Sequence, residues 1–397
     1  MADQAAEPAR AEPAWGADLG PGPEGPPRQA EAALHLAAEM GAVAGRFPLD
    51  WGALQPDGRG RLDPAALARL DRQMDALGEA GLAPHPVLAP ASLPRDIRMR
   101  GGWTARDTAW RFAEFACRAA GRIGDRMASL TVDTGAPGFA RQDAAWAGRP
   151  IGMAEPVAFA ACLHHLLLGR GLALSALRQE SGRWRLGAGL ATPPAPWDDT
   201  LASSDAVMIA DALGWEASLA TLRHGRYPEL AADRLGRLVE EDDEARCRAA
   251  ADLLVLDHAG PVFARMDAAA PGGVDLVPRP RGSMPDTAGP GALRRAIDRL
   301  AAAWPGAAVD LRLHIRAEDP AAQDGRIADH ARIEGLDAHL DTALAAWAAG
   351  APVATIMLGP MLDDGAAPPA GLAAWDARAD TPRPKDSWHR LQRRIRG

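Results

Sequence analysis

The stretch from residue 42 to residue 103 constrains the fold of this chain more than any other part of its sequence. Ala42–Leu49 is a short apolar run that predicts a buried strand. Asp63 and Pro64 are the residue types of a helix N-cap and of a first helical position, and apolar residues follow them at three- and four-residue spacing. Leu82–Leu88 predicts a second strand. Because strand, helix and strand at this pitch form a βαβ crossover, we expect a parallel sheet.

Composition limits the classes of protein to be considered. The chain has 397 residues, a net charge of −8 and 47% hydrophobic residues, which is enough for a large core in one domain. The sequence contains no basic patch or stripe, so it does not suggest a nucleic acid or an anionic membrane as partner. The first residues contain no apolar segment behind a positive start, so no signal peptide is predicted. No run approaches the length that a membrane-spanning helix requires.

The three cysteines, Cys117, Cys162 and Cys247, are scattered over predicted helices without disulfide or metal spacing. We expect reduced thiols in a cytoplasmic protein. His165 lies one helical turn after Cys162, but packing explains two such helical residues better than a metal ion does. The sequence therefore predicts no metal site and no cofactor.

The residue sequence of the stretch from 42 to 103 is more informative than its hydrophobic periodicity. It is similar to glycoside hydrolase family 1, the retaining β-glucosidases and β-galactosidases, whose fold is a (β/α)8 TIM barrel. The matching segments are 46–47, 50–52, 54–60, 80–81, 93–94, 101–104 and 106–108, and later 163–168, 224–228, 325–349 and 384–387. The resemblance implies a single α/β barrel domain over residues 28–397. Residues 1–27 are then an Ala/Pro/Gly-rich tail that contains a candidate first strand near residues 13–17.

The resemblance also implies two catalytic glutamates, and neither is found where it is expected. Counted from Gly124-Asp125-Arg126, the acid/base position falls on Gly135, and the nucleophile position falls on Ile315. Glycine cannot donate a proton, and isoleucine cannot form a glycosyl ester. Retaining hydrolysis requires two carboxyl groups about 5 Å apart.

Other sugar-holding positions of the family are also replaced. The glutamine that follows the first strand is absent, and further replacements are found at Pro90, Ala91, Thr134, His258, Ala259, Gly359, Ala366 and Ala367. Matches to the family fall on helices, turns and strand starts, whereas these departures fall at strand ends. Barrel enzymes keep their chemistry on the face where the strands end. The barrel is therefore predicted to persist while the site has changed.

Two carboxylates could act in place of the missing pair. Asp133 lies two residues before Gly135, so both side chains would lie on the same face of a strand. Glu318 follows Ile315 by three residues. The simpler interpretation is a capped or ion-paired Asp133 and a solvated Glu318 on a loop.

Four residues are candidates for binding a substrate at the strand ends: Arg46, Asp257, His258 and His314. Arg46 matches the arginine that lies beside the nucleophile in the family. If it is buried, it requires an anion. Asp133, Asp257 and Glu318 are the predicted partners.

Two functional hypotheses follow. The first is a non-hydrolytic family 1-like pseudoenzyme that binds a carbohydrate or a protein, or serves as a scaffold. The alternative is a divergent β-glycosidase, an O-glycosyl hydrolase that uses Asp133 and Glu318. A carboxyl–carboxyl distance of about 5 Å would suit retention, and about 6.5–9.5 Å would suit inversion. The sequence leaves the ligand and the oligomeric state open.

Overall fold

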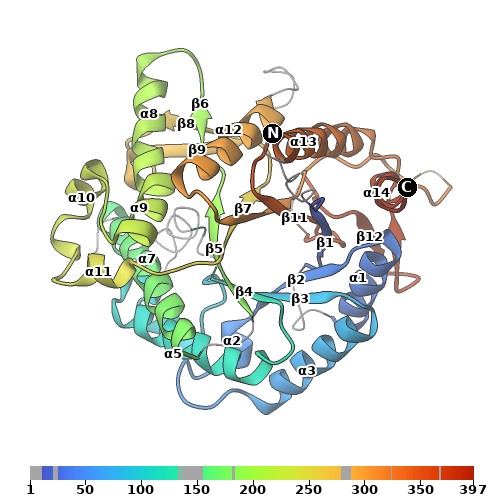
Figure 1. The fold of residues 1–397 in the computed structure, drawn as a ribbon, viewed down its shortest axis with the longest axis horizontal. Coiled ribbons are helices and arrows are strands. Elements are labelled where there is room, and N and C mark those ends of the chain that lie inside the picture. The colour runs from blue at the N-terminus through green and yellow to red at the C-terminus, as the bar shows by residue number, and fades with distance from the viewer. Residues whose placement is uncertain are drawn as a thin grey trace, which may run out of the picture.

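In the computed structural model, eight parallel strands close into a barrel that is surrounded by helices (Figure 1). The structure describes residues 11–20, 26–132, 135, 155–180, 184–278, 288–322, 324–365 and 368–397. The barrel strands are β1 (Ala14–Asp18), β2 (Ala44–Leu49), β3 (Ala83–Leu88), β4 (Ser129–Val132), β5 (Arg185–Ala191), β7 (Leu253–His258), β10 (Ala308–Leu313) and β11 (Val353–Leu358). They are neighbours in that order, and β11 pairs with β1. The predicted single-domain (β/α)8 TIM barrel is confirmed.

Helices pack on the outside of the barrel strands (Figure 1). The longer ones are α1 (Pro27–Met40), α3 (Pro64–Glu79), α5 (Asp107–Ile123), α7 (Glu155–Glu180), α12 (Ala288–Ala303), α13 (His330–Ala348) and α14 (Asp386–Arg396). The shorter ones are α2 (Trp51–Leu54), α4 (Arg95–Met99), α8 (Leu201–Asp211), α9 (Ala217–His224), α10 (Glu229–Leu235) and α11 (Asp243–Cys247).

Helix α3 forms as its sequence predicts. The Asp63 side chain accepts a hydrogen bond of 2.8 Å from the amide of Ala66, and Pro64 occupies the first turn. Its buried residues recur at three- and four-residue spacing, as an amphipathic helix on a core requires: Ala66, Leu70, Met74 and Leu77.

The motifs that carry the family resemblance build part of the core. Trp51 stacks on Phe115 with ring centroids 5.5 Å apart, and Trp103 meets Phe112 edge-on at the same separation. The indole N–H of Trp103 donates to the carbonyl of Pro90 at 3.0 Å. This aromatic cluster joins α2, α5 and the loop after β3, so these motif residues contribute to folding.

Helix α7 corrects the prediction that no run reaches membrane-spanning length. Residues Pro156–Glu180 are long and apolar enough by composition, yet 89% of the tested window is buried within the protein. The helix packs against α5 and the barrel strands. Its hydrophobicity on all sides is that of a core helix between two layers.

The segment from residue 267 to 291 is rich in proline and glycine, and it contains a strand. β9 (Val274–Pro278) pairs in antiparallel fashion with β8 (Val262–Met266), and β6 (Ala195–Pro196) pairs with β8 on its other side. This small sheet projects beside α8 (Figure 1). A second small sheet, β12 (Ala373–Asp376) with β13 (Thr381–Pro384), precedes α14.

Candidate functional site at the barrel mouth

The carboxyl ends of four barrel strands bring five polar side chains together. We call Asp18, Arg46, Asp257, Arg312 and His314 the mouth cluster, since they lie where β1, β2, β7 and β10 end. Successive strand residues point to opposite faces, so Arg312 and His314 share the inner face of β10 and its extension. Parallel register places Asp18 beside Arg46, and Asp257 beside Arg312.

Arg312 is the centre of the mouth cluster. Its Nε–H donates to Asp18 Oδ2 at 2.6 Å, and its Nη1 donates to Asp257 Oδ2 at 2.8 Å. His314 Nε2 donates to the other oxygen of Asp257 at 2.6 Å. Arg46 Nη1 lies 3.4 Å from Asp18 Oδ2. Both carboxylates are therefore held by cationic or imidazole groups.

The electrostatics of the mouth cluster favour ionised carboxylates. Burial acts to raise the pKa of Asp257, but the charges of Arg312 and His314 outweigh it and hold this pKa well below its usual range. The pKa of Asp18 is likewise lowered, because Arg312 and Arg46 overcome the effect of burial. The positive charges of Arg46 and Arg312 then balance the negative charges of Asp18 and Asp257.

Arg46 is buried and forms an ion pair, as expected, and one of its partners is a residue that the sequence did not suggest; the predicted partner Asp133 lies outside the described residues. The unexpected partner is Asp18, whose side chain is 1% exposed. The charge of Arg46 adds to those of Arg312 and His314 in lowering the pKa of Asp257. Sequence reasoning passed over Asp18 and Arg312. A search for charged residues that are register neighbours at strand ends would have found both.

His258 does not share the inner face with the other binding candidates. As the residue next to Asp257 on β7, it points toward the helix layer, where its ring centroid lies 4.9 Å from that of His339 on α13. Its Nδ1 is 2.8 Å from the hydroxyl of Thr192. Burial and the neighbouring imidazoles lower the pKa of His258 to about 3, so it is neutral. It is a packed histidine of the outer layer.

The two positions predicted for the catalytic glutamates differ in geometry. Ile315 is buried, and its Cγ2 would lie 2.8 Å from a Cβ added at Gly335 of α13. Its side chain thus faces the helix layer, and the neighbouring side chain that faces the mouth is that of His314. Gly135 has a φ of 34°, in the left-handed region that disfavours other residues.

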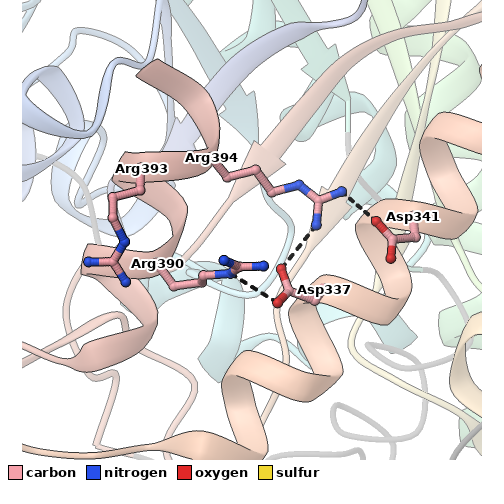
Figure 2. Close-up of a pocket in the computed structure, with 5 residues that line it drawn as sticks. All are labelled: Asp337, Asp341, Arg390, Arg393 and Arg394. Carbon is pink, nitrogen blue, oxygen red and sulfur yellow. Dashed lines mark hydrogen bonds and ion pairs between the residues drawn. The ribbon is translucent and has the colours of Figure 1, made fainter. Parts of the chain in front are cut away.

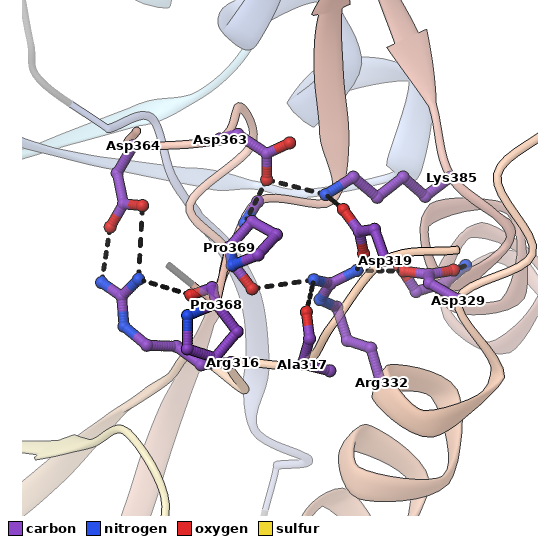
Figure 3. A network of polar contacts seen from close by, with 12 residues as sticks. Arg316, Ala317, Asp319, Asp329, Arg332, Asp363, Asp364, Pro368, Pro369 and Lys385 are labelled. Carbon is purple, nitrogen blue, oxygen red and sulfur yellow. Dashed lines mark hydrogen bonds and ion pairs between the residues drawn. The ribbon is translucent and has the colours of Figure 1, made fainter. Parts of the chain in front are cut away.

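Glu318 lies on a loop that is fixed by a buried ion-pair network (Figure 3). The fully buried guanidinium of Arg332 donates to the carbonyls of Ile315, Ala317 and Pro369 and to Asp319. Lys385, the only lysine of the chain, is also fully buried and pairs with Asp319 at 2.6 Å and Asp363 at 2.7 Å. Glu318 itself is exposed and makes no hydrogen bond or ion pair with a described residue.

Asp133 lies outside the described residues, so its separation from Glu318 is not defined. Within the described part of the chain, no three His, Cys, Asp or Glu residues are arranged to hold a metal ion. His164 and His165 are engaged in packing: His164 contacts Asp243 and Tyr227, and His165 contacts the carbonyl of Trp103.

The comparison with known families agrees with the barrel and its motifs. A model of glycosyl hydrolase family 1 matches residues 28–367, which is most of the chain. The chain belongs to glycosyl hydrolase family 1. Seven of the barrel strands, β2 to β11, lie within the matched range.

Individual relatives of this family 1 chain carry β-glucosidase names. Thermostable beta-glucosidase B of Thermobispora bispora is 37% identical over 196 residues, which is 49% of this chain and 40% of the relative. Beta-glucosidase A of Thermotoga maritima is 24% identical over 347 residues, covering 83% of this chain and 76% of the relative. The first match thus spans less than half of that relative.

Solved structures show the same barrel. The family 1 β-glucosidase from Thermotoga maritima in complex with isofagomine lactam has a TM-score of 0.80 at 22% identity, covering 92% of this chain and 86% of that chain. The AHE enzyme from Alicyclobacillus herbarius has a TM-score of 0.81 at 24% identity, with coverages of 92% and 86%. At these identities the likeness concerns the fold.

Proposed function

We propose that this family 1 protein is a non-hydrolytic binding protein whose ligand, a carbohydrate or a segment of a partner protein, enters the barrel mouth. The observation that carries the proposal is the mouth cluster itself. Where the family resemblance implies a glutamate nucleophile at the end of β10, this strand presents His314, bonded to Asp257. An imidazole held by a carboxylate does not form the glycosyl ester that retaining hydrolysis needs.

The described carboxylates of the mouth are not free to attack a sugar. Asp257 has one oxygen bonded to His314 and the other bonded to Arg312. Asp18 is 1% exposed, and its Oδ1 accepts the amide of Gly20 at 3.1 Å while its Oδ2 receives the arginines. A nucleophile must present an oxygen to C1, and such an approach would break these charge-assisted bonds.

The acid/base position also argues against retaining chemistry. Gly135 has no ionisable group, and its backbone is left-handed, so a glutamate there would be strained. The alternative, a divergent β-glycosidase that uses Asp133 and Glu318, draws support from the β-glucosidase names of the relatives. Glu318, however, is exposed on this loop and makes no hydrogen bond or ion pair with a described residue that would position it for catalysis.

Two groups of the mouth cluster are open to a ligand. The side chains of Asp257 and Arg312 are 30% and 20% exposed, whereas Asp18 is buried beneath them. A carboxylate and a guanidinium side by side offer acceptors and donors that match the hydroxyl groups of a sugar or a polar peptide. These exposed atoms favour a polar ligand over an apolar one.

The test is an assay of the purified protein on an activated aryl β-glucoside, together with calorimetry on mono- and disaccharides and mass spectrometry of co-purifying proteins. We expect no turnover, and binding that Asp257→Asn weakens. Arg118→Met, which alters an exposed pair on α5, is the matched control. Turnover that is abolished by Asp257→Asn or by Glu318→Gln would establish the glycosidase instead.

A further inference from the structure

A hollow on the outside of the barrel lies between α13 and α14 and is separate from the mouth cluster. Its volume is about 710 Å³, within the range of small-ligand sites. It is lined by the loop before α13, the first turns of that helix, strand β13 and the exposed side of α14. A second hollow of about 370 Å³ continues from it and shares Arg390 and Arg393 (Figure 2). We call the two together the α13–α14 groove.

The larger hollow of the α13–α14 groove is lined by more basic than acidic side chains. The larger hollow has two aspartates, Asp324 and Asp386, against two histidines and four arginines, which are Arg326, Arg383, Arg390 and Arg393. Asp386 pairs with Arg326, Asp376 with Arg383 and Asp337 with Arg390, so Arg393 is the arginine of this wall that has no carboxylate partner among the described residues.

The acidic residues near the groove are held by arginines of the groove itself. Asp386 receives both Nε and Nη2 of Arg326, at 2.8 and 2.6 Å. Asp337 receives Arg390 at 3.1 Å and Arg394 at 3.0 Å. No ion-pair partner for Arg393 exists among the described residues, and Figure 2 shows its guanidinium without a contact.

Donors remain on two neighbouring side chains of α14. Arg390 uses only its Nε–H, on Asp337, so both of its terminal nitrogens are available. Arg393 has all five of its N–H groups available. The two residues are three apart on one helix, which places their Cβ atoms about 5–6 Å apart on the same face. The groove therefore offers two guanidinium forks side by side.

We infer that the α13–α14 groove is a binding site for a small polyanion with at least two oxyanion groups, phosphate or carboxylate. Each guanidinium fork matches one oxyanion group in bidentate fashion. His330 and His389 line the same wall and add further donors. A ligand with one oxyanion group would occupy only one of the forks. The inference does not depend on any function of the barrel mouth.

The experiment is isothermal calorimetry of the full chain with inorganic pyrophosphate, citrate and orthophosphate. We expect pyrophosphate or citrate to bind more tightly than orthophosphate, and to bind more weakly as the salt concentration rises. Arg393→Ala should weaken binding by about tenfold or more, as the loss of a charged hydrogen-bonding group does. Arg393→Lys keeps the positive charge but lacks the forked guanidinium, so its affinity should lie between those of the parent protein and Arg393→Ala.

Arg72→Ala is the matched control, because Arg72 is an exposed arginine on α3 without an ion-pair partner among the described residues. It should leave the affinity unchanged. Since Arg393 has no such partner either, its variants should have the same melting temperature as the parent protein. The inference is overturned if none of the three anions binds, if orthophosphate binds as tightly as pyrophosphate, or if Arg393→Ala and Arg72→Ala have equal affinities. Because the test uses no sugar, its failure leaves the proposed function of the mouth untouched.

Discussion

Arg312→Met is the perturbation that tests the mouth cluster most directly. The side chain of Arg312 is 20% exposed and bridges two carboxylates, of which Asp18 is 1% exposed. Removing one partner of a buried ion pair costs about 3–5 kcal/mol, because the other charge is left without compensation. Asp18 would retain Arg46 at 3.4 Å, and the partly exposed Asp257 would retain His314. We therefore expect the free energy of unfolding to fall by about 3 kcal/mol at neutral pH, near the low end of this range.

The loss should depend on pH in a defined direction. In the native protein the pKa values of Asp18 and Asp257 are depressed, so the stability that they contribute is complete above about pH 4 and is lost as the pH falls through their folded-state values. Without Arg312, burial raises the pKa of Asp18 relative to the parent. The variant then takes up a proton more readily, and its deficit should shrink from pH 7.5 toward pH 5.

Urea unfolding followed by the fluorescence of the 12 tryptophans measures this deficit at both pH values. The control, Arg118→Met, removes an exposed i,i+4 pair with Glu114 and should cost only about 0.3–0.5 kcal/mol. A loss below about 1 kcal/mol for Arg312→Met at pH 7.5 would mean that Asp18 is not held by this arginine. An equal loss at both pH values would refute the electrostatic account.

Three further outcomes are expected. Asp63→Ala removes the N-cap bond to Ala66 and should lower the unfolding free energy by about 0.5–2 kcal/mol; an unchanged melting temperature would contradict the cap. Lys385→Met removes the buried cation between Asp319 and Asp363, of which only Asp319 keeps Arg332, and should cost about 3 kcal/mol by urea unfolding; a neutral result would show that Lys385 is dispensable to the network in Figure 3. The double variant Gly135→Glu with Ile315→Glu should melt lower and hydrolyse no aryl β-glucoside, because the second glutamate would face α13; measurable turnover would overturn the orientation of β10.

Much of the barrel could be predicted because its signals are local. The N-cap at Asp63 and the apolar spacing of α3 are contained in a few consecutive residues. The strand predicted at Leu82–Leu88 corresponds to β3 within one residue. The strand β9 has no comparable local signal, because its five residues lie in a Pro/Gly-rich context and are defined by pairing with β8. Pairing between segments is not a local property of either one.

The mouth cluster was only partly predictable. Arg46, Asp257 and His314 were singled out from the family resemblance, and the structure brings them together. His258 was singled out with them, but it faces the helix layer. The nucleophile position was placed on Ile315, and a shift of one residue along a strand exchanges its inner and outer faces. Spacing along the chain does not resolve such a shift.

The sequence by itself determined the fold class, the order of strands and helices and the family, because hydrophobic period, caps and turn motifs act over short distances. The tertiary structure alone decided which charges meet. Asp18 and Arg312 are 294 residues apart in the chain, and they touch because closure of the barrel places the ends of β1 and β10 at one mouth. A buried charge takes the nearest counter-charge in space, whatever its distance in sequence.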